Sequence, residues 1–235
     1  MLLRQTRNAT KARRHKVPTK NLQKMKVIDH LKKANGKTLF TIEILPPLKG
    51  ENIKNLFDNL DPLMEFHPPF IDVTYHREEY VYKKKDNGLL EKRSTRKRPG
   101  TVGICAALQN HYKVDTVPHI ICGGFSREET ENALIDLHFL GIDNVLVLQG
   151  DAIKNEGRFV PEADGHRFAS DLLEQVVNMN KGRFLEDDLQ NSAPTNFCIG
   201  VAGYPEKHFA APNLKTDLKY LKLKVDLGAE YIVTQ

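Results

Sequence analysis

The sequence predicts an α/β protein built on a parallel β-sheet, with the pattern of a (β/α)8 TIM barrel of which about six βα units are present. Strand-like segments alternate with helical ones along the chain, which is typical of parallel sheets. Polar residues gather directly after several strand-like segments, where barrel enzymes carry their sites. The first strand is followed by Leu-Pro-Pro-Leu-Lys-Gly and not by the GxGxxG fingerprint of a doubly wound dinucleotide-binding sheet.

The strands are predicted from β-branched, aromatic or continuous apolar residues between turn residues. Segment 143–149 is apolar through its centre, as expected for a parallel strand that is covered on both faces. A closed barrel needs eight strands, and only six segments have strand character. They are 38–45, 70–75, 117–122, 143–149, 197–204 and 230–234.

The helices are predicted from apolar residues at intervals of three and four. The first such pattern begins directly after Met25, and the later ones cover 53–64, 102–112, 126–140, 165–180 and 214–225. Ser126 and Glu129 form a capping box, and Gly141 and Gly228 stand where helices end. The basic stretch 76–100 carries tyrosines and reads either as a binder of phosphate or single-stranded nucleic acid or as a mobile solvated insertion, which we favour.

Charge is unevenly distributed along the 235 residues. Residues 1–26 carry nine Lys/Arg and no acid, whereas residues 27–235 carry 26 bases and 30 acids. An acidic body argues against nucleic acid as a partner. We therefore expect a basic N-terminal extension, 1–24, before a partial TIM-barrel domain at 25–235. The extension reads as an Arg-rich targeting segment, a disordered arm, or translation from an upstream start with Met25 as the true beginning, which we favour.

Composition limits the protein class further. Apolar residues make up 40% and charged residues 28%, which excludes a mainly disordered chain. No apolar run approaches the ~18–20 residues of a membrane span. The three cysteines lie far apart without a CxxC pair, so we expect buried free thiols and a reducing, cytoplasmic location.

Glu43 is the first candidate for chemistry. Alternation in the first strand places it on one face with Leu39, Thr41 and Leu45. Burial in an apolar strand would favour the protonated form of a carboxyl, which a general acid needs. An edge-strand glutamate that faces solvent is the alternative interpretation.

Further candidates follow the later strands, although each has a structural explanation when taken alone. Gly150-Asp151 follows the fourth strand, where glycine permits close approach of a ligand. Asp217 and Lys224 are seven residues apart on one helix and therefore share a face. Thr74 and His119 by themselves are more typical of structural residues, and no His/Cys/Asp cluster has metal-ligand spacing.

Taken together, the strand-end motifs resemble the methylenetetrahydrofolate reductases. They occur in the order and near the spacing of that family, and the resemblance covers about residues 25–235. The motifs are Glu43–Pro47, Val73–Tyr75, Pro118-His119, Gly150-Asp151, Tyr204–Glu206 with His208, and Lys224–Ala229 followed by Thr234-Gln235.

The resemblance implies a (β/α)8 barrel that holds FAD. In this family NAD(P)H gives a hydride to the flavin, which passes it to 5,10-methylenetetrahydrofolate to form 5-methyltetrahydrofolate. This is a ping-pong reaction of one-carbon metabolism and methionine biosynthesis. The resemblance also implies a homo-oligomer for the full-length protein, and the sequence does not distinguish NADH from NADPH.

The resemblance further assigns roles to single residues. Glu43 would be the general acid that opens the folate ring, and Asp151 would stabilise the cationic iminium beside the flavin and the pterin. Gln235 matches a folate contact. Positions that match FAD contacts are Thr74, His119, Leu148, Gly150, Asp151, Ala202, Tyr204, His208, Asp217 and Lys224.

Some positions depart from the family pattern. Gln149 stands where many members have arginine, and Tyr220 and Leu223 stand where others place polar or basic FAD contacts. The last two barrel strands of the family have no counterpart before Gln235, so we expect residues 1–235 alone to be neither stable nor active. A truncated, non-catalytic flavin- or folate-binding paralogue and another TIM-barrel flavoenzyme, such as a proline dehydrogenase-like oxidase, remain alternatives.

Overall fold

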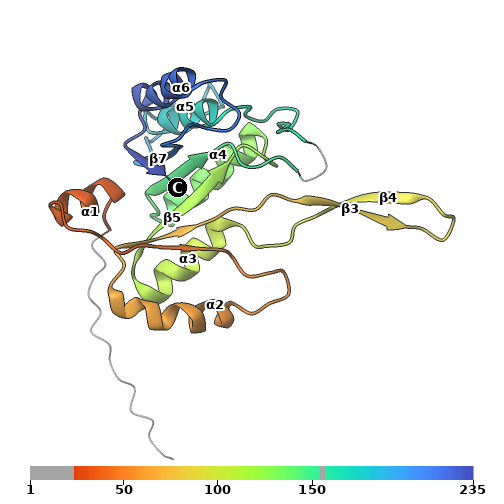
Figure 1. The fold of residues 1–235 in the computed structure, drawn as a ribbon, viewed down its shortest axis with the longest axis horizontal. Coiled ribbons are helices and arrows are strands. Elements are labelled where there is room, and N and C mark those ends of the chain that lie inside the picture. Colours follow the sequence, from red (N-terminus) through yellow and green to blue (C-terminus); the bar gives the residue numbers. More distant parts are fainter. Residues whose placement is uncertain (1–23, 154–156, 235) are drawn as a thin grey trace, which may run out of the picture.

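The computed structural model describes residues 24–153 and 157–234. Its centre is a parallel sheet of six strands that curls into part of a barrel, in the order β1-β2-β5-β6-β7-β8 (Figure 1). This confirms the predicted fold class and each predicted strand. The strands are β1 (Ile42–Ile44), β2 (Phe70–Val73), β5 (Asp115–Ile121), β6 (Asn144–Leu148), β7 (Cys198–Gly203) and β8 (Tyr231–Thr234).

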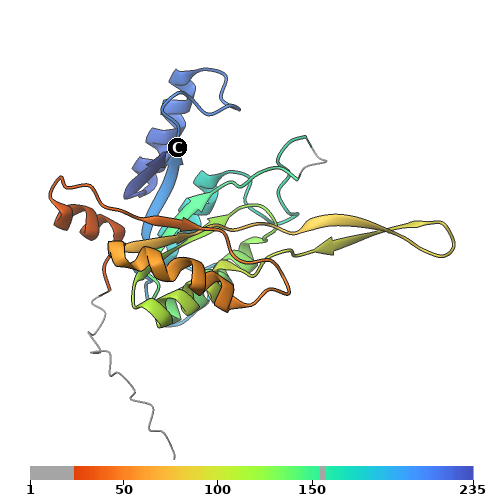
Figure 2. The same ribbon diagram turned by 60° about the horizontal axis from the view of Figure 1, so that its bottom comes forward.

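Helices cover the convex side of the curled sheet (Figures 1 and 2). They alternate with the strands, as predicted, although the predicted helix 53–64 continues as a 3₁₀-helix where Asp61-Pro62 interrupts it, because proline cannot donate a backbone hydrogen bond. The helices are α2 (Ile53–Leu60), η1 (Asp61–Phe66), α3 (Thr101–Tyr112), α4 (Arg127–Phe139), α5 (Ala169–Met179) and α6 (Leu214–Leu227).

Strand alternation divides the buried residues into two clusters. The larger lies between the sheet and the helices and includes Ile44, Leu134 and Val147. The smaller lies on the concave face, where Val117 and Leu146 pack together with the other inward residues Val27, Phe70 and Cys198. The concave face is therefore the interior of the partial barrel.

Helix α1 (Val27–Ala34) covers the amino ends of the strands. Its first buried amide, that of Val27, donates to the side-chain oxygen of Asn144 over 2.8 Å, and the Asn144 amide donates to the carbonyl of Met25. The His30 Nε2 atom lies 2.7 Å from the Asp115 carboxylate. These contacts close one end of the barrel and leave the carboxyl ends as the open rim.

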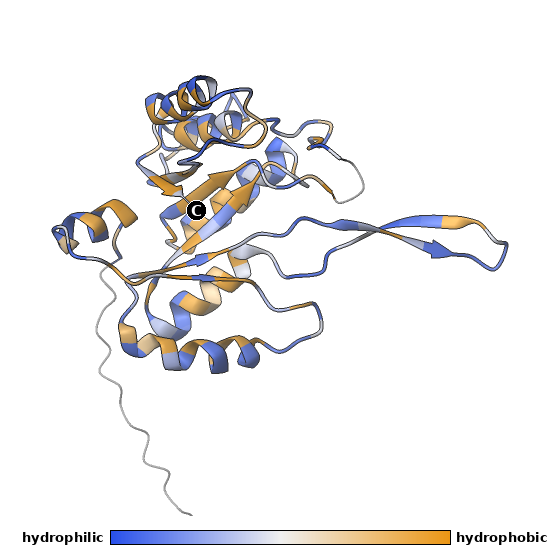
Figure 3. Ribbon diagram, in the orientation of Figure 1, coloured by the Kyte–Doolittle hydropathy of each residue, from blue (hydrophilic) through white to orange (hydrophobic). Residues whose placement is uncertain are grey.

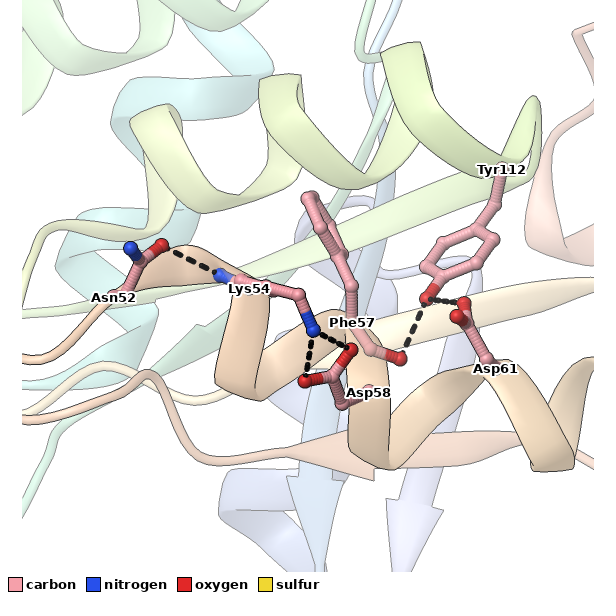
Figure 4. Close-up of polar contacts among 6 residues, drawn as sticks. All are labelled: Asn52, Lys54, Phe57, Asp58, Asp61 and Tyr112. Carbon is pink, nitrogen blue, oxygen red and sulfur yellow. Dashed lines mark hydrogen bonds and ion pairs between the residues drawn. The ribbon is translucent and has the colours of Figure 1, made fainter. Parts of the chain in front are cut away.

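Tyr112 joins the last turn of α3 to α2 and η1 (Figure 4). Its hydroxyl donates to the Asp61 carboxylate over 2.7 Å and lies 3.2 Å from the carbonyl oxygen of Phe57. Burial is the larger cause that raises the pKa of the Tyr112 hydroxyl, and the Asp61 carboxylate raises it further. In the same view Asn52 caps α2 by accepting from the Lys54 amide, so both ends of α2 are fixed by side chains.

The basic stretch 76–100 contains regular structure that the sequence analysis did not predict. It forms an antiparallel hairpin of β3 (Glu79–Lys84) and β4 (Leu90–Thr95) that projects from the barrel (Figure 1). Gly88 closes the connecting loop with a φ of +81°, a conformation that glycine adopts without strain. The Asn87-Gly88 pair is a recognised hairpin signal that the run of charges around it obscured.

Two further expectations concern the whole chain. Cys105, Cys122 and Cys198 are free and buried, as predicted. Within the described residues, no helix is both long and apolar enough to span a bilayer.

Candidate active site

Most of the predicted site residues lie near or beyond the carboxyl ends of the sheet strands, whereas Asp217 and Lys224 lie on α6. Gln235 lies outside the described residues. Because parallel strands end at a common edge, this edge brings together side chains that are far apart in sequence. Along it, β1 and β2 supply Glu43 and Thr74, β5 supplies His119, β6 leads to Gly150-Asp151, and β7 leads to Tyr204.

A polar cluster lies on the concave face of β1, β2 and β5. His119 is buried, and its Nε2 atom lies 3.8 Å from the Glu43 carboxylate and 3.7 Å from the Asp72 carboxylate. These separations exceed hydrogen-bond length, and within the described residues the Nε2 atom has no hydrogen-bond partner. A buried ring nitrogen without a partner is costly, so it is a candidate contact for a bound ligand.

Glu43 is on the predicted face but is not buried. Its side chain is 56% exposed, although Ile42 and Ile44 on either side are buried. Those isoleucines point to the helices, whereas Glu43 points to the open concave side, where little of the described chain covers it. The expectation of a carboxyl buried by its own strand was therefore wrong, and the solvent-facing alternative describes the side chain.

Thr74 follows β2 at the rim. Its hydroxyl donates to the carbonyl of Ile44 over 3.1 Å, and its amide donates to the same oxygen. The side chain thus extends the pairing of β1 with β2 by one residue. One hydroxyl lone pair can still accept a bond from a ligand at the rim.

Gly150 and Asp151 turn the chain outward after β6. Gly150 has a φ of +82°, and a Cβ at this position would lie 3.2 Å from the Ile121 side chain. Asp151 is exposed. Burial lowers the pKa of His76, with Arg98 acting in the same direction and the Asp151 carboxylate opposing them. Asp151 therefore acts electrostatically across the rim on the segment that follows β2.

The residues predicted after β7 form one connected group with α6. The Lys224 ammonium donates to the carbonyl of Ala202 over 2.6 Å. The His208 amide donates to the Asp217 carboxylate over 2.8 Å, and the His208 ring packs edge-on against Tyr204 with centroids 4.8 Å apart. Burial lowers the pKa of Lys224, and Asp217 opposes this shift. The shared face of Asp217 and Lys224 is therefore directed to the end of β7 and is not a solvated flank.

The sequence analysis missed two charged residues at the rim. Asp72 stands beside Glu43 in the strand register and, with it, flanks His119; period-two alternation in β2 could have placed it on the face of Thr74. Arg77 is only 12% exposed and pairs with Glu162 over 3.2 Å. Its Nε and Nη1 atoms are buried without a partner in the described residues, and no local pattern signals this long-range contact.

Next to the polar cluster lies a pocket of about 340 Å³ between the start of α3 and α4. Tyr75 and Phe125 line it with their rings 5.0 Å apart, and His119 forms part of its wall. The Arg96 guanidinium donates to the Tyr75 hydroxyl over 3.4 Å. The pocket is thus bordered by the Tyr75–Phe125 aromatic pair and by His119, the buried member of the polar cluster.

The departures from the family pattern have definite places. The Gln149 amide donates to the carbonyl of Arg167 over 2.8 Å, so this side chain holds a loop where an arginine would bring charge. Tyr220 and Leu223 are exposed on α6.

A curled parallel sheet with its polar residues at the carboxyl ends of the strands defines this protein as an incomplete TIM barrel with an open rim. Residues 26–235 match the family model described as methylenetetrahydrofolate reductase. The chain belongs to the methylenetetrahydrofolate reductase family.

Individual relatives agree with this assignment. The chain is 32% identical over 222 residues to "Methylenetetrahydrofolate reductase (NADH) 1" of Arabidopsis thaliana, covering 90% of this chain and 33% of the relative. It is 33% identical over 214 residues to "Methylenetetrahydrofolate reductase 1" of Schizosaccharomyces pombe, covering 90% and 30%. It is 26% identical over 205 residues to "5,10-methylenetetrahydrofolate reductase" of Escherichia coli, covering 87% and 57%. The chain thus spans about a third of the plant and yeast relatives.

Proposed function

We propose that this chain forms most of the catalytic barrel of a flavin-dependent enzyme that reduces 5,10-methylenetetrahydrofolate to 5-methyltetrahydrofolate with NAD(P)H, in a ping-pong reaction. The observation that carries the proposal is the placement of Glu43 beside His119 at the open rim of a family barrel. We also propose a cytoplasmic location, which the three buried free thiols support, and a role in methionine biosynthesis.

The rim residues fit FAD as the cofactor. His119 offers a buried nitrogen without a partner in the described residues, and the positive φ of Gly150 lets the chain turn at the end of β6. Lys224 and Asp217 offer a cation and an anion fixed beside β7. When bound, FAD would supply reversible hydride acceptance. Its proposed contacts are Thr74, His119, Leu148, Gly150, Asp151, Ala202, Tyr204, His208, Asp217 and Lys224.

Glu43 and Asp151 have the proposed roles at the folate. Glu43 would hand a proton to the ring nitrogen of the folate as the five-membered ring opens, and Asp151 would hold the resulting cation by its negative charge. Both side chains are exposed, so a substrate can reach them. The bound ligands must exclude water from Glu43, because its own strand does not.

The test separates the two half-reactions in the full-length protein, which should purify yellow. Glu43→Gln keeps the shape and removes the acid. Reduction of the flavin by NAD(P)H should survive, whereas reoxidation by the folate should slow by about 10²–10⁴-fold. Stopped-flow absorbance measures each step, and Glu65→Gln, an exposed position away from the rim, is the matched control. Equal loss in both half-reactions, or a colourless protein that takes up no FAD, would contradict the proposal.

A further inference from the structure

The pocket between the starts of α3 and α4 has no part in the proposed folate chemistry, although it adjoins the candidate active site. Its volume of about 340 Å³ lies within the range of about 300–1,000 Å³ that is typical of small-molecule pockets. Its lining is mainly apolar and includes Val102, Ile120 and Ala133 beside the aromatic pair of Tyr75 and Phe125. A lining of this kind suits an aromatic ring.

The positive end of a helix and a cation meet in this pocket. Arg96 lines it together with Gly100 and Thr101 at the start of α3. A Cβ at Gly100 would overlap the Arg96 guanidinium, so this group lies directly against the helix N-terminus. Within the described residues no side chain caps α3, and its first turn contains no acid. Because the first amides of a helix carry partial positive charge, an anion would satisfy both groups at once.

The neighbouring chain holds Arg96 in this position. Arg96 directly follows β4, and Figure 3 shows the hairpin of β3 and β4 that leads to it as mostly hydrophilic. The next two residues are tied to the loop after β1: the carbonyl of Lys97 accepts from the Lys49 amide over 2.7 Å, and the Arg98 guanidinium donates to the carbonyl of Pro46. A guanidinium has five N–H donors, so a ligand can bind Arg96 without breaking its 3.4 Å contact with the Tyr75 hydroxyl.

His119 is an independent sign of a ligand at the same place. It is only 5% exposed and lines the pocket, and its Nε2 atom has no hydrogen-bond partner within the described residues. A buried polar atom normally has a partner. Because His119 is also a proposed FAD contact, the pocket borders the proposed flavin site, and its occupant should be a ligand that is brought to the flavin.

We propose, resting on the function proposed above, that this pocket binds the adenosine 2′-phosphate end of the reductant and makes the enzyme prefer NADPH to NADH. The adenine stacks on Tyr75 and Phe125, and the 2′-phosphate bridges Arg96 and the amino end of α3. A phosphate monoester carries a charge of about −1.5 to −2 at pH 7, and NADH has no such group.

The folate tail fits this pocket less well. The guanidinium of Arg96 contacts the hydroxyl of Tyr75, so the ring and the dianion of a matching ligand must lie close together. In adenosine 2′-phosphate they are attached to neighbouring ribose carbons. In the folate tail an amide separates the benzoyl ring from the glutamate carboxylates.

The first test measures binding without catalysis. Calorimetric titration of the FAD-loaded, full-length protein with 2′,5′-ADP, which has the 2′-phosphate but no nicotinamide, should give a Kd at least tenfold below that of 5′-AMP. Arg96→Met should remove this difference. Arg93→Met, at an exposed position in β4, makes the same change in charge and should keep it. Equal affinity for the two nucleotides, an unchanged difference in Arg96→Met, or tighter binding of p-aminobenzoylglutamate than of 2′,5′-ADP would overturn the proposal.

The second test does not depend on the folding of the hairpin. Gly103 lies in the first turn of α3 and lines the pocket, and no atom lies within 4 Å of a Cβ built there. Gly103→Asp places a negative charge that favours the helix and repels a dianion. Binding of 2′,5′-ADP should therefore weaken at least tenfold while the melting temperature is kept. Gly103→Asn, the neutral isostere, should weaken binding less than about threefold, and equal binding by the two variants would contradict the phosphate site.

Reduction of the flavin separates this proposal from the one on which it rests. In anaerobic stopped-flow absorbance the apparent Kd should be at least tenfold lower for NADPH than for NADH, and Arg96→Met should abolish the difference without lowering the limiting rate. Equal use of NADH and NADPH would overturn the pocket assignment and leave the proposed reductase intact. Reduction by neither dinucleotide would contradict the reductase itself, and the nucleotide titration would still decide the pocket.

Discussion

Gly200→Ala tests the packing inside the barrel at the position where β7 meets β8. Gly200 faces the concave side, and a Cβ there would lie 2.3 Å from Cζ of Tyr231 and 2.7 Å from its hydroxyl oxygen. Such separations are far inside van der Waals contact. The Tyr231 ring must therefore move, although its hydroxyl now donates to the carbonyl of Val145 over 3.2 Å.

The expected cost follows from these contacts. Loss of one buried hydrogen bond costs about 0.5–1.5 kcal/mol, and forcing a methyl group into a packed interior costs about 1–3 kcal/mol. We expect the free energy of unfolding to fall by about 2–4 kcal/mol. At about 2–4 °C for each kcal/mol in a domain of this size, the melting temperature should fall by about 5–15 °C.

Gly103→Ala is the matched control. Gly103 is exposed within α3, and no atom lies within 4 Å of a Cβ built there. Alanine has the higher helix propensity, so this change should raise the free energy of unfolding by up to about 1 kcal/mol. The same chemical change thus has opposite expected signs at the two glycines.

Chemical denaturation of the full-length protein measures both changes, and a double-mutant cycle identifies the cause. In a Tyr231→Ala background the ring is absent, so Gly200→Ala should cost less than about 1 kcal/mol, leaving a coupling energy of about 2 kcal/mol. If the full penalty persists in that background, or if Gly200→Ala is harmless in the wild type, then Tyr231 does not cross Gly200 and the derived inner packing is refuted.

Three other outcomes are expected. Asn144→Ala leaves a buried amide of α1 without its acceptor and should lower the free energy of unfolding by about 1–3 kcal/mol in chemical denaturation; an unchanged value would contradict the closure by α1. Lys224→Met should weaken FAD binding at least tenfold in fluorescence titration, because it removes a proposed charged contact. The free energy of unfolding should change by less than about 1 kcal/mol, because burial already disfavours the charged ammonium and lowers its pKa. Burial raises the pKa of Cys122 to about 12 and of Cys198 to about 11, so both should resist alkylation in the native state at about pH 8. Their folded pKa values exceed the unfolded value of about 8.5, so stability should be retained below that pH and fall as pH rises toward 11, and native reactivity or a flat profile would contradict their burial.

Local signals were sufficient for much of the fold. The capping box at Ser126 and Glu129 is present, with the Glu129 amide donating to the Ser126 hydroxyl over 3.1 Å. The apolar run 143–149 corresponds to the buried strand β6. In each case the sequence signal lies within a few residues of the element that it specifies, which is why sequence alone suffices.

Features that depend on distant contacts could not be predicted. Arg77 is buried against Glu162, 85 residues away, and no spacing rule joins them. The hairpin has a local turn signal at Asn87-Gly88, but the surrounding lysines resemble a solvated segment until the cross-strand pairs are known. Exposure of Glu43 depends on what covers the concave side, which alternation within its own strand does not determine.

Exposure does not remove Glu43 from the proposed site. It means that bound ligands, and not the strand itself, must exclude water from this proposed acid. The proposed cofactor contacts Lys224 and Asp217 are already bonded to backbone around the end of β7, so that part of the rim is fixed before a ligand arrives. Glu43 and Asp151 are exposed, which suits groups that must meet a substrate. Removal of water from the site favours the protonated form of a carboxyl, which a general acid needs, and here the bound ligands must drive the water out. The proposed catalysis by Glu43 should therefore depend on ligands that cover the rim, whereas the proposed binding residues of β7 and α6 are organised by the fold itself.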